Sequence, residues 1–398
     1  MKKLLLFLSV LMFLQCKTNT GKQSERELPE IDVSRNYPEK VMYLQDIAKV
    51  EYIPLETNDI ALMSNYAKIF YVSDNYIITA NIGEGDVIVF DGKGKSKFSF
   101  NKKGQSGTEY NNMQTIAFDE KAKEVFISNW VSSTNRTCLV YTEDGKFKRV
   151  FSFPDNLLPR EMYSFDDETL FVYDEFGMLQ GENYSNKPYS KISKMDGSVV
   201  ETLNIHLPVR MHNRIVIEIS IEGQQGWMPV TSPISYHRSY GNNFLIADWS
   251  SDTIYRLTPR MELQPMIVRT PSLLNSDPKT VLSNELVTDK FIFFTKAVFD
   301  FEMAKRSRLF PPVKSLMYDF QTGQLNEYKL INKDFEAGEV VFNTSITPGN
   351  TGVYILDVPQ LFEADEAGKL KGELKQLLKS LDIEDNPVLV KVTFNHNS

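Results

Sequence analysis

Residues that could carry chemistry are few in this chain of 398 residues, and no motif brings them together. The four histidines, His206, His212, His237 and His396, form no His-Glu-x-x-His pair, and no Cys/His spacing typical of zinc occurs. A Gly-Lys-Ser/Thr phosphate loop and a Gly-x-Ser-x-Gly turn are also missing. The sequence therefore predicts no cofactor and no metal motif. A metal site built from His and Asp residues of different strands, with His237 among them, stays open.

The three tryptophans, Trp130, Trp227 and Trp249, are the first candidates for ligand contacts. Exposed indole rings stack on sugars and aromatic ligands, and they are common anchors of binding surfaces. Asp174 ends one apolar run, and His237 lies in or near the first strand of the fourth repeat described below, which should line the channel of the predicted fold. We count both with the tryptophans as candidate ligand-binding residues. The alternative is that the indoles wedge loops against the strands.

A basic cluster supplies a second candidate. Arg306 and Arg308 lie within Lys305-Arg-Ser-Arg308, next to Leu309-Phe310. The planar guanidinium group matches carboxylates and phosphates. The alternative is a charged run in contact with water.

Short β-strands must position all these residues. The stretch Ile69–Tyr110 contains four β-branched or aromatic runs separated by Asn, Asp and Gly turns, which is typical of a four-stranded antiparallel meander. The same unit recurs at spacings near the ~40–50 residues of a propeller blade, with two longer insertions. The second strands of the six units end at Asn81, Trp130, Asp174, Trp249, Lys296 and Asp357. The predicted fold class is all-β, a six-bladed β-propeller of four-stranded antiparallel blades.

The sixth unit lacks its fourth strand, and an unpaired alternating run, residues 50–55, precedes the first unit. Because an open blade edge invites aggregation, we expect residues 50–55 to join the last blade and close the ring. Residues 361–381 carry leucines at spacings of three and four, which predicts an amphipathic helix. This helical insertion should pack on the propeller rim or cover the channel mouth; docking of a partner is the alternative.

Loop lengths differ between the two faces of the predicted propeller. On one face, which we call the short-turn face, turns such as Asp74-Asn75 and Asp196-Gly197 are short. On the other, the long-loop face, four segments are long: Glu175–Pro188, Leu207–Ser232, Ala297–Pro312 and Val358–Asn386. Because function usually lies on loops carried by a rigid scaffold, the long-loop face is the candidate functional face.

The N-terminus is typical of an exported lipoprotein. Met1-Lys2-Lys3 and the apolar run to Leu14 are too short to span a membrane and resemble a bacterial lipoprotein signal, residues 1–16, ending at Cys16 as the lipidated residue. A simple secretory signal is the alternative. We expect a polar tether over 17–40 and the propeller over 41–398. The other cysteine, Cys138, lies in an apolar run and should be a buried packing residue.

Composition limits the partners. A net charge of −8 and a pI near 5.3 argue against nucleic-acid binding. The expected partners are a membrane, through the N-terminal lipid, and a glycan, peptide or protein.

Four segments carry a family resemblance: Tyr52-Ile-Pro-Leu-Glu-Thr57, Lys103-Gly-Gln-Ser-Gly-Thr-Glu-Tyr110, Ser251-Asp-Thr-Ile-Tyr-Arg-Leu257 and Glu384-Asp-Asn-Pro-Val-Leu-Val390. With them the chain resembles the six-bladed propeller lipoproteins of anaerobic gut bacteria, a family largely of unassigned function. The second segment departs from the family's Gly-Pro-Gly-Glu-Tyr pattern at Ser106–Thr108. The resemblance implies fold and export, and almost no chemistry. Surface lipoproteins of these bacteria often carry an acidic run directly after the lipidated cysteine, whereas here Lys17-Thr-Asn-Thr20 follows Cys16 and the first acidic residue is Glu25. The resemblance therefore favours a periplasm-facing position over the cell surface.

Three hypotheses follow for function. The first is a binding or scaffold module that uses the long-loop face. The second is an enzyme of the lyase or hydrolase type with a site at the channel mouth, because a propeller can host either. The third is an assembly subunit that docks through residues 361–381.

Overall fold

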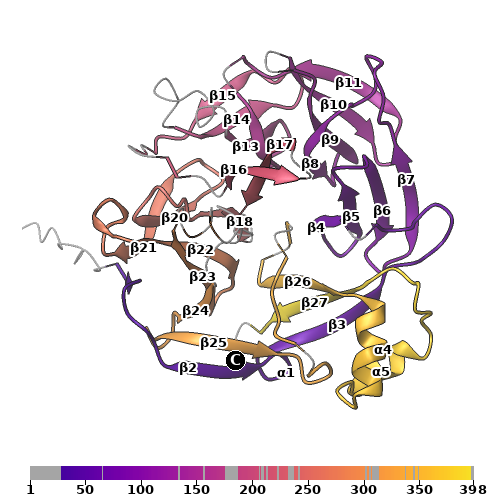
Figure 1. The fold of residues 1–398 in the computed structure, drawn as a ribbon. Coiled ribbons are helices and arrows are strands. Elements are labelled where there is room, and N and C mark those ends of the chain that lie inside the picture. The colour runs from indigo at the N-terminus through magenta and orange to yellow at the C-terminus, as the bar shows by residue number, and fades with distance from the viewer. Residues whose placement is uncertain are drawn as a thin grey trace, which may run out of the picture.

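Six β-sheets form a ring in the computed structural model of the protein (Figure 1). The structure describes residues 28–395 except 65, 133–134, 156, 175–186, 206, 208–209, 212–213, 222–223, 232–236, 241–242, 301–302, 304–305, 307–312, 337, 344–345 and 348. In each sheet, strands that follow one another in the chain lie side by side and pair antiparallel, and their order runs from the channel outwards. The predicted six-bladed propeller is confirmed.

The blades follow one another along the chain. Blade 1 contains β4 (Lys68–Val72), β5 (Tyr76–Asn81), β6 (Asp86–Asp91) and β7 (Ser96–Asn101). Blade 2 contains β8 (Met113–Asp119), β9 (Glu124–Trp130), β10 (Arg136–Thr142) and β11 (Phe147–Ser152). Blade 3 contains β12 (Pro159–Ser164), β13 (Thr169–Asp174), β14 (Tyr189–Ser193) and β15 (Val199–Thr202).

The second half of the ring adds insertions to the same plan. A hairpin of β16 (Arg214–Ile221) and β17 (Gln224–Thr231) lies between blades 3 and 4 in the chain. Blade 4 contains β18 (His237–Tyr240), β19 (Asn243–Ile246), β20 (Thr253–Leu257) and β21 (Leu263–Thr270), and a 3-10 turn η2 (Leu273–Asn275) follows. Blade 5 contains β22 (Lys279–Val287), β23 (Phe291–Phe299), β24 (Lys314–Asp319) and β25 (Leu325–Ile331).

The N-terminal strand β3 (Ala48–Pro54) closes the ring, as predicted for residues 50–55. It pairs antiparallel with β27 (Val388–Phe394), which in turn pairs with β26 (Thr351–Leu356). Blade 6 therefore combines chain segments from both ends of the sequence (Figure 1). Within the described residues its sheet has three strands. Ile346, which precedes β26 in the chain, pairs with β4 of the neighbouring blade 1 and not with β26. Its N–H donates to the Phe70 carbonyl at 3.0 Å.

Part of the segment 17–40, which we predicted as a polar tether, belongs to the propeller. β1 (Glu30–Asp32) pairs parallel with β21, and β2 (Glu39–Tyr43) pairs parallel with β25. A short turn of helix, α1 (Leu44–Ile47), connects β2 to β3. Ile31 is fully buried, which explains why so short a strand holds. Residues 17–27 lie outside the described part of the chain.

One apolar cluster fills each space between neighbouring blades, so every blade is buried on both faces. Cores lie between blades 1 and 2, 2 and 3, 3 and 4, 4 and 5, 5 and 6, and 6 and 1. Every residue of β5 and of β13 is buried. This explains why these strands read as continuous apolar runs.

Two short helices replace the single predicted helix. α4 (Val358–Glu366) and α5 (Gly372–Leu378) are separated by a turn in which Gly368 has a φ of 68°. Their leucines, among them Leu361, Leu374 and Leu378, are buried in the core beside blade 6. The expected packing on the propeller rim is confirmed (Figure 1). No helix in the described part of the chain is long and apolar enough to cross a membrane.

Candidate functional site

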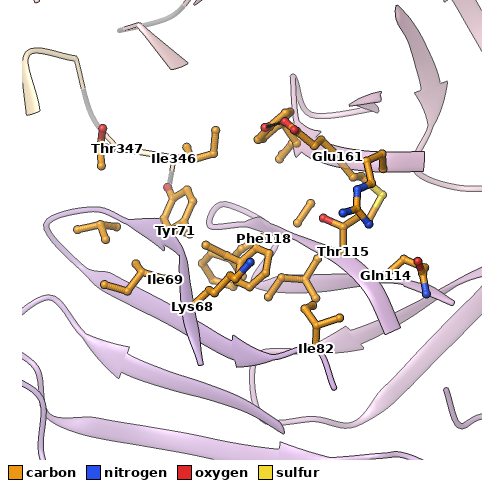
Figure 2. A pocket seen from close by; sticks show the side chains of 18 of the residues that line it. Lys68, Ile69, Tyr71, Ile82, Gln114, Thr115, Phe118, Glu161, Ile346 and Thr347 are labelled. Carbon is orange, nitrogen blue, oxygen red and sulfur yellow. Dashed lines mark hydrogen bonds between the residues drawn. The ribbon is translucent and has the colours of Figure 1, made fainter. Parts of the chain in front are cut away.

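A pocket of about 940 Å³ occupies the central channel. The innermost strands β4, β8 and β12 of blades 1, 2 and 3 line it, and Phe244, Pro259 and Ile346 complete its wall. In Figure 2 the side chains of Ile346, Tyr71, Phe118 and Glu161 surround this space. Small-molecule sites usually measure ~300–1,000 Å³, so the channel pocket is the candidate functional site.

Polar side chains line the end of the pocket where the innermost strands begin. This end belongs to the long-loop face, because each innermost strand follows a link between blades. We call these residues the polar mouth: Lys68, Glu84, Gln114, Arg160 and Glu161. Tyr66, whose side chain is 80% exposed, lies beside them in the link that leads into β4.

Two β-bulges direct residues of the polar mouth. The pairing of β8 with β9 skips Gln114, and the pairing of β12 with β13 skips Arg160. A bulged residue is left out of the ladder and its strand bends, which changes the direction of the side chain. Both skipped residues line the pocket. The bulges thus turn two polar side chains toward the channel.

A buried acceptor stands beside each bulge. Asn129 Oδ1 accepts hydrogen bonds from the N–H groups of Asn111 and Asn112 at 3.1 and 3.0 Å. Asp174 Oδ1 accepts one from the Leu158 N–H at 2.9 Å. Both acceptors are buried. They fix the chain immediately before β8 and β12, and therefore the start of both bulges.

Aromatic rings line the other end of the pocket, toward the short-turn face. We call Tyr71, Phe118, Phe165 and Phe244 the aromatic floor. The ring centroids of Tyr71 and Phe118 are 5.3 Å apart at 68°, and those of Phe165 and Phe244 are 5.6 Å apart at 14°. Such edge and stacked contacts hold the rings in fixed positions.

Carboxylates in the pocket are hydrogen-bonded within the protein. Glu161 Oε2 accepts from Tyr163 OH at 2.5 Å, and Glu84 Oε2 accepts from Asn81 Nδ2 at 2.7 Å. At the floor, Glu120 accepts from Tyr71 OH at 2.8 Å.

This last contact separates the pKa values of its two partners. Burial, together with the bond to Glu120, raises the pKa of Tyr71. Burial alone would raise the pKa of Glu120, but hydrogen bonds from Ser73, Asn75 and Tyr71 lower it. Near neutral pH the phenol therefore stays protonated and the carboxylate stays ionised.

The predicted site residues do not gather at the pocket. Trp249 is 1% exposed and packs in the core between blades 3 and 4, which agrees with the wedging alternative and leaves no ring face for a ligand. Trp130, half-buried, ends β9. Asp174 is 3% exposed and holds Leu158.

The remaining predicted residues lie elsewhere or are not described. Arg306 is exposed and does not line the pocket. His237 begins β18, the innermost strand of blade 4, as expected, and Trp227 lies in β17. The side chains of both, and all of Arg308 and Cys16, lie outside the described residues.

Possible metal ligands and the Cys138 thiol were located within the described part of the chain. No group of three or more His, Cys, Asp or Glu residues placed to hold a metal ion occurs there. Cys138 is fully buried in the core between blades 2 and 3, and burial raises the pKa of its thiol. Its prediction as a packing residue is confirmed.

Sequence reasoning missed Lys68, Gln114, Arg160 and Glu161. Each stands at or near the start of an innermost strand, just after the link that leads into it. Aligning the repeats on their first strands, rather than on the ends of their second strands, would have shown that polar residues recur at this position in the first three repeats.

The ring of six blades and the pocket in its channel define a six-bladed β-propeller with a ligand-sized central cavity. The chain belongs to the family described as "Domain of unknown function (DUF4934)", which matches residues 28–393. No curated protein matches the sequence.

Solved structures share the fold. A candidate exported protein from Bacteroides fragilis is 15% identical, with a TM-score of 0.60 over 90% of this chain and 99% of its own. Virginiamycin B lyase from Staphylococcus aureus is 11% identical, with a TM-score of 0.39 over 87% and 100%. A member of the DUF4221 family from Bacteroides vulgatus is 8% identical, with a TM-score of 0.44 over 88% and 97%. The family match and the Bacteroides fragilis structure confirm the resemblance to a propeller family of unassigned function.

Proposed function

We propose that this protein is an exported, lipid-anchored binding module that receives a glycan, a peptide or a segment of a partner protein in its central channel, through the long-loop face. The observation that carries the proposal is the pocket of about 940 Å³ with five polar side chains at its mouth. Its size and its combination of apolar walls with a few polar groups are those of ligand sites.

Preorganisation supports the proposal. The bulges at Gln114 and Arg160 follow links that buried hydrogen bonds already hold. A site whose side chains are fixed before binding loses less conformational entropy when the ligand arrives. Tyr66, largely exposed beside the mouth, offers the amphipathic ring that binding surfaces favour.

Binding measurements on matched variants test the proposal. We would record thermal unfolding and calorimetric titration of the protein against panels of oligosaccharides and peptides. A ligand of the native state raises the unfolding midpoint. We expect Arg160→Gln to abolish or strongly weaken this binding, whereas Arg35→Gln, which changes an exposed arginine away from the pocket, should not change it. Binding that is equal in both variants would place the ligand outside the channel.

The same titration tests the lyase or hydrolase alternative. Glu161 and Tyr163 share a hydrogen bond in the pocket and could exchange a proton with a substrate. Product analysis of each bound ligand after long incubation distinguishes the two functions. Unchanged ligand supports the binding module, and conversion that stops in Glu161→Gln supports the enzyme.

The proposed lipid anchor rests on the N-terminal sequence, in which Cys16 follows a short apolar run. Incorporation of labelled palmitate that is lost in Cys16→Ser would support it; unlabelled protein would leave simple secretion. We further propose a periplasm-facing position, since the residues after Cys16 carry no acidic run. Protease added to intact cells should then leave the protein uncut.

A further inference from the structure

We propose that the ligand of the channel is an anionic amphipathic molecule, with an apolar body of about two fused rings on the aromatic floor and one acidic group at Lys68. This inference rests on the proposed function only in taking the channel pocket as the binding site. It goes beyond that proposal by naming a small-molecule class of ligand for the pocket in place of a glycan, a peptide or a protein segment. Three features of the pocket support it: the hydrogen bonds of its hydroxyl groups, the partners of its charges, and its length.

Hydroxyl groups at the inner end of the pocket are already engaged. Tyr71 donates to Glu120 at 2.8 Å, Tyr163 to Glu161 at 2.5 Å, and Thr347 to the Thr351 carbonyl at 2.6 Å. Ser164 Oγ accepts from Lys194 Nζ at 2.9 Å. A sugar placed on the floor would bury hydroxyl groups beside aromatic rings with few partners left, which costs free energy. An apolar body has no such cost.

The charges at the mouth are not equally engaged. Both carboxylates, Glu84 and Glu161, accept hydrogen bonds from neighbouring side chains. Lys68 is exposed, and no described residue forms an ion pair or a side-chain hydrogen bond with it. The Lys68 ammonium group is thus a mouth charge to which the described residues supply no partner, and it favours an anionic group of the ligand at this point of the mouth.

The length of the pocket sets the size of the body. Lys68 begins β4, and Val72 ends it on the side of the short-turn face. At ~3.3 Å per residue, the mouth and the floor are about 13 Å apart. An acidic group joined to a two-ring body fits this length.

Fluorescence titration with three probes tests the proposal. Anilinonaphthalene sulfonate carries an aromatic body and an anionic group, N-phenyl-1-naphthylamine has the same body without charge, and maltohexaose is neutral and polar. We expect the sulfonate to bind about fivefold more tightly than the neutral amine, as for a single exposed charge pair. Maltohexaose, followed by calorimetry, should not bind in the channel.

Two variants with matched controls assign the contacts. Lys68→Gln should weaken sulfonate binding to the level of the neutral amine and leave the amine unchanged, while Lys102→Gln, another exposed lysine, has no effect. Phe165→Leu should weaken both aromatic probes, while Phe98→Leu, a half-buried phenylalanine outside the pocket, should not. A thermal melt of each variant confirms that it is folded, since the sulfonate also binds unfolded chains.

The outcomes separate this inference from the proposed function. Equal affinities for the two aromatic probes, or sulfonate binding that Lys68→Gln leaves unchanged, would overturn the inference. Maltohexaose or peptide binding that Arg160→Gln removes, without binding of the sulfonate, would overturn it while the proposed function stands. Binding of all probes that no pocket variant changes would overturn both.

Discussion

The Asp174 carboxylate accepts a hydrogen bond from the Leu158 N–H at 2.9 Å, two residues before the bulged Arg160. The acceptor is the last residue of β13, and the donor precedes the innermost strand β12 of the same blade. Asp174 is 3% exposed, so water cannot replace it. One buried contact thus contributes both to the stability of blade 3 and to the position of a polar-mouth residue.

Replacing this acceptor should affect both properties. Asp174→Ala leaves the Leu158 N–H without this partner, and we expect a loss of about 1–3 kcal/mol in the free energy of unfolding. Ligand binding that depends on Arg160 should weaken as well. Asp174→Asn keeps an acceptor oxygen and should lose less of both. Urea unfolding and calorimetry measure these effects; equal losses in the two variants would show that the hydrogen bond is not the cause.

The N-terminal strand β1 gives a second prediction. Ile31 is fully buried against blade 4, so Ile31→Ala should lower the free energy of unfolding by about 2–5 kcal/mol. Val41 lies in β2 with 49% of its surface exposed, and Val41→Ala should cost much less. Chemical denaturation compares them. If residues before 41 formed only a tether, the Ile31→Ala variant and the unchanged protein would have the same free energy of unfolding.

The fold could be predicted from sequence because its signals are local. Turn residues such as Asp74-Asn75 and Asp196-Gly197 separate runs of β-branched and aromatic residues, and the four-stranded meander predicted within Ile69–Tyr110 corresponds to the sheet of β4, β5, β6 and β7. Ring closure followed from counting strands, since the sixth repeat lacked one. β1 escaped prediction because three residues, Glu30–Asp32, carry too little pattern to distinguish a strand from a loop.

The pocket could not be predicted because it depends on pairing across the ring. Whether Gln114 or Arg160 faces the channel depends on a shift of one residue in the register of a strand pair. The same limit applies to Trp249, which the sequence marks as a candidate binder and tertiary packing buries. The sequence shows which residue types are suited to ligand contacts. Strand register and packing between blades determine which of their side chains line the pocket.

Acid stability should depend on Glu124, which binds Arg149 within blade 2 and so holds the arginine that reaches blade 3. Its carboxylate accepts from Arg149 at 2.8 and 3.0 Å and pairs with Lys148, and Arg149 also donates to the Lys194 carbonyl. Burial disfavours the charge, but these partners outweigh it, so the pKa of Glu124 lies below its ordinary value of 4.5. A carboxyl whose pKa is lowered by folding stabilises the protein at pH values above its pKa in the unfolded state. This stabilisation is lost as the pH falls through its pKa in the folded state.

We therefore expect the free energy of unfolding to fall below about pH 4.5, and to fall less steeply in Glu124→Gln. Glu366→Gln, at the exposed end of α4, should keep the slope of the unchanged protein. Urea unfolding at a series of pH values between neutral and acid gives both slopes. A slope in Glu124→Gln that matches the unchanged protein would assign the acid sensitivity to other carboxylates.

Cys138 offers a probe of opening in blade 2. Cys138 belongs to β10, which lies between β9 and β11, and it has no exposed surface. Because burial raises the pKa of the thiol, the reactive thiolate is scarce in the folded state. We expect a thiol reagent to modify the folded protein only as fast as the blade opens, and the unfolded protein at once. The Asp174→Ala variant, if less stable, should react faster, by about tenfold for each 1.4 kcal/mol of unfolding free energy that it loses. Mass spectrometry over time measures the rate, with Cys138→Ala as the control for the remaining cysteine. Rapid modification of the folded, unchanged protein would contradict the burial of this strand.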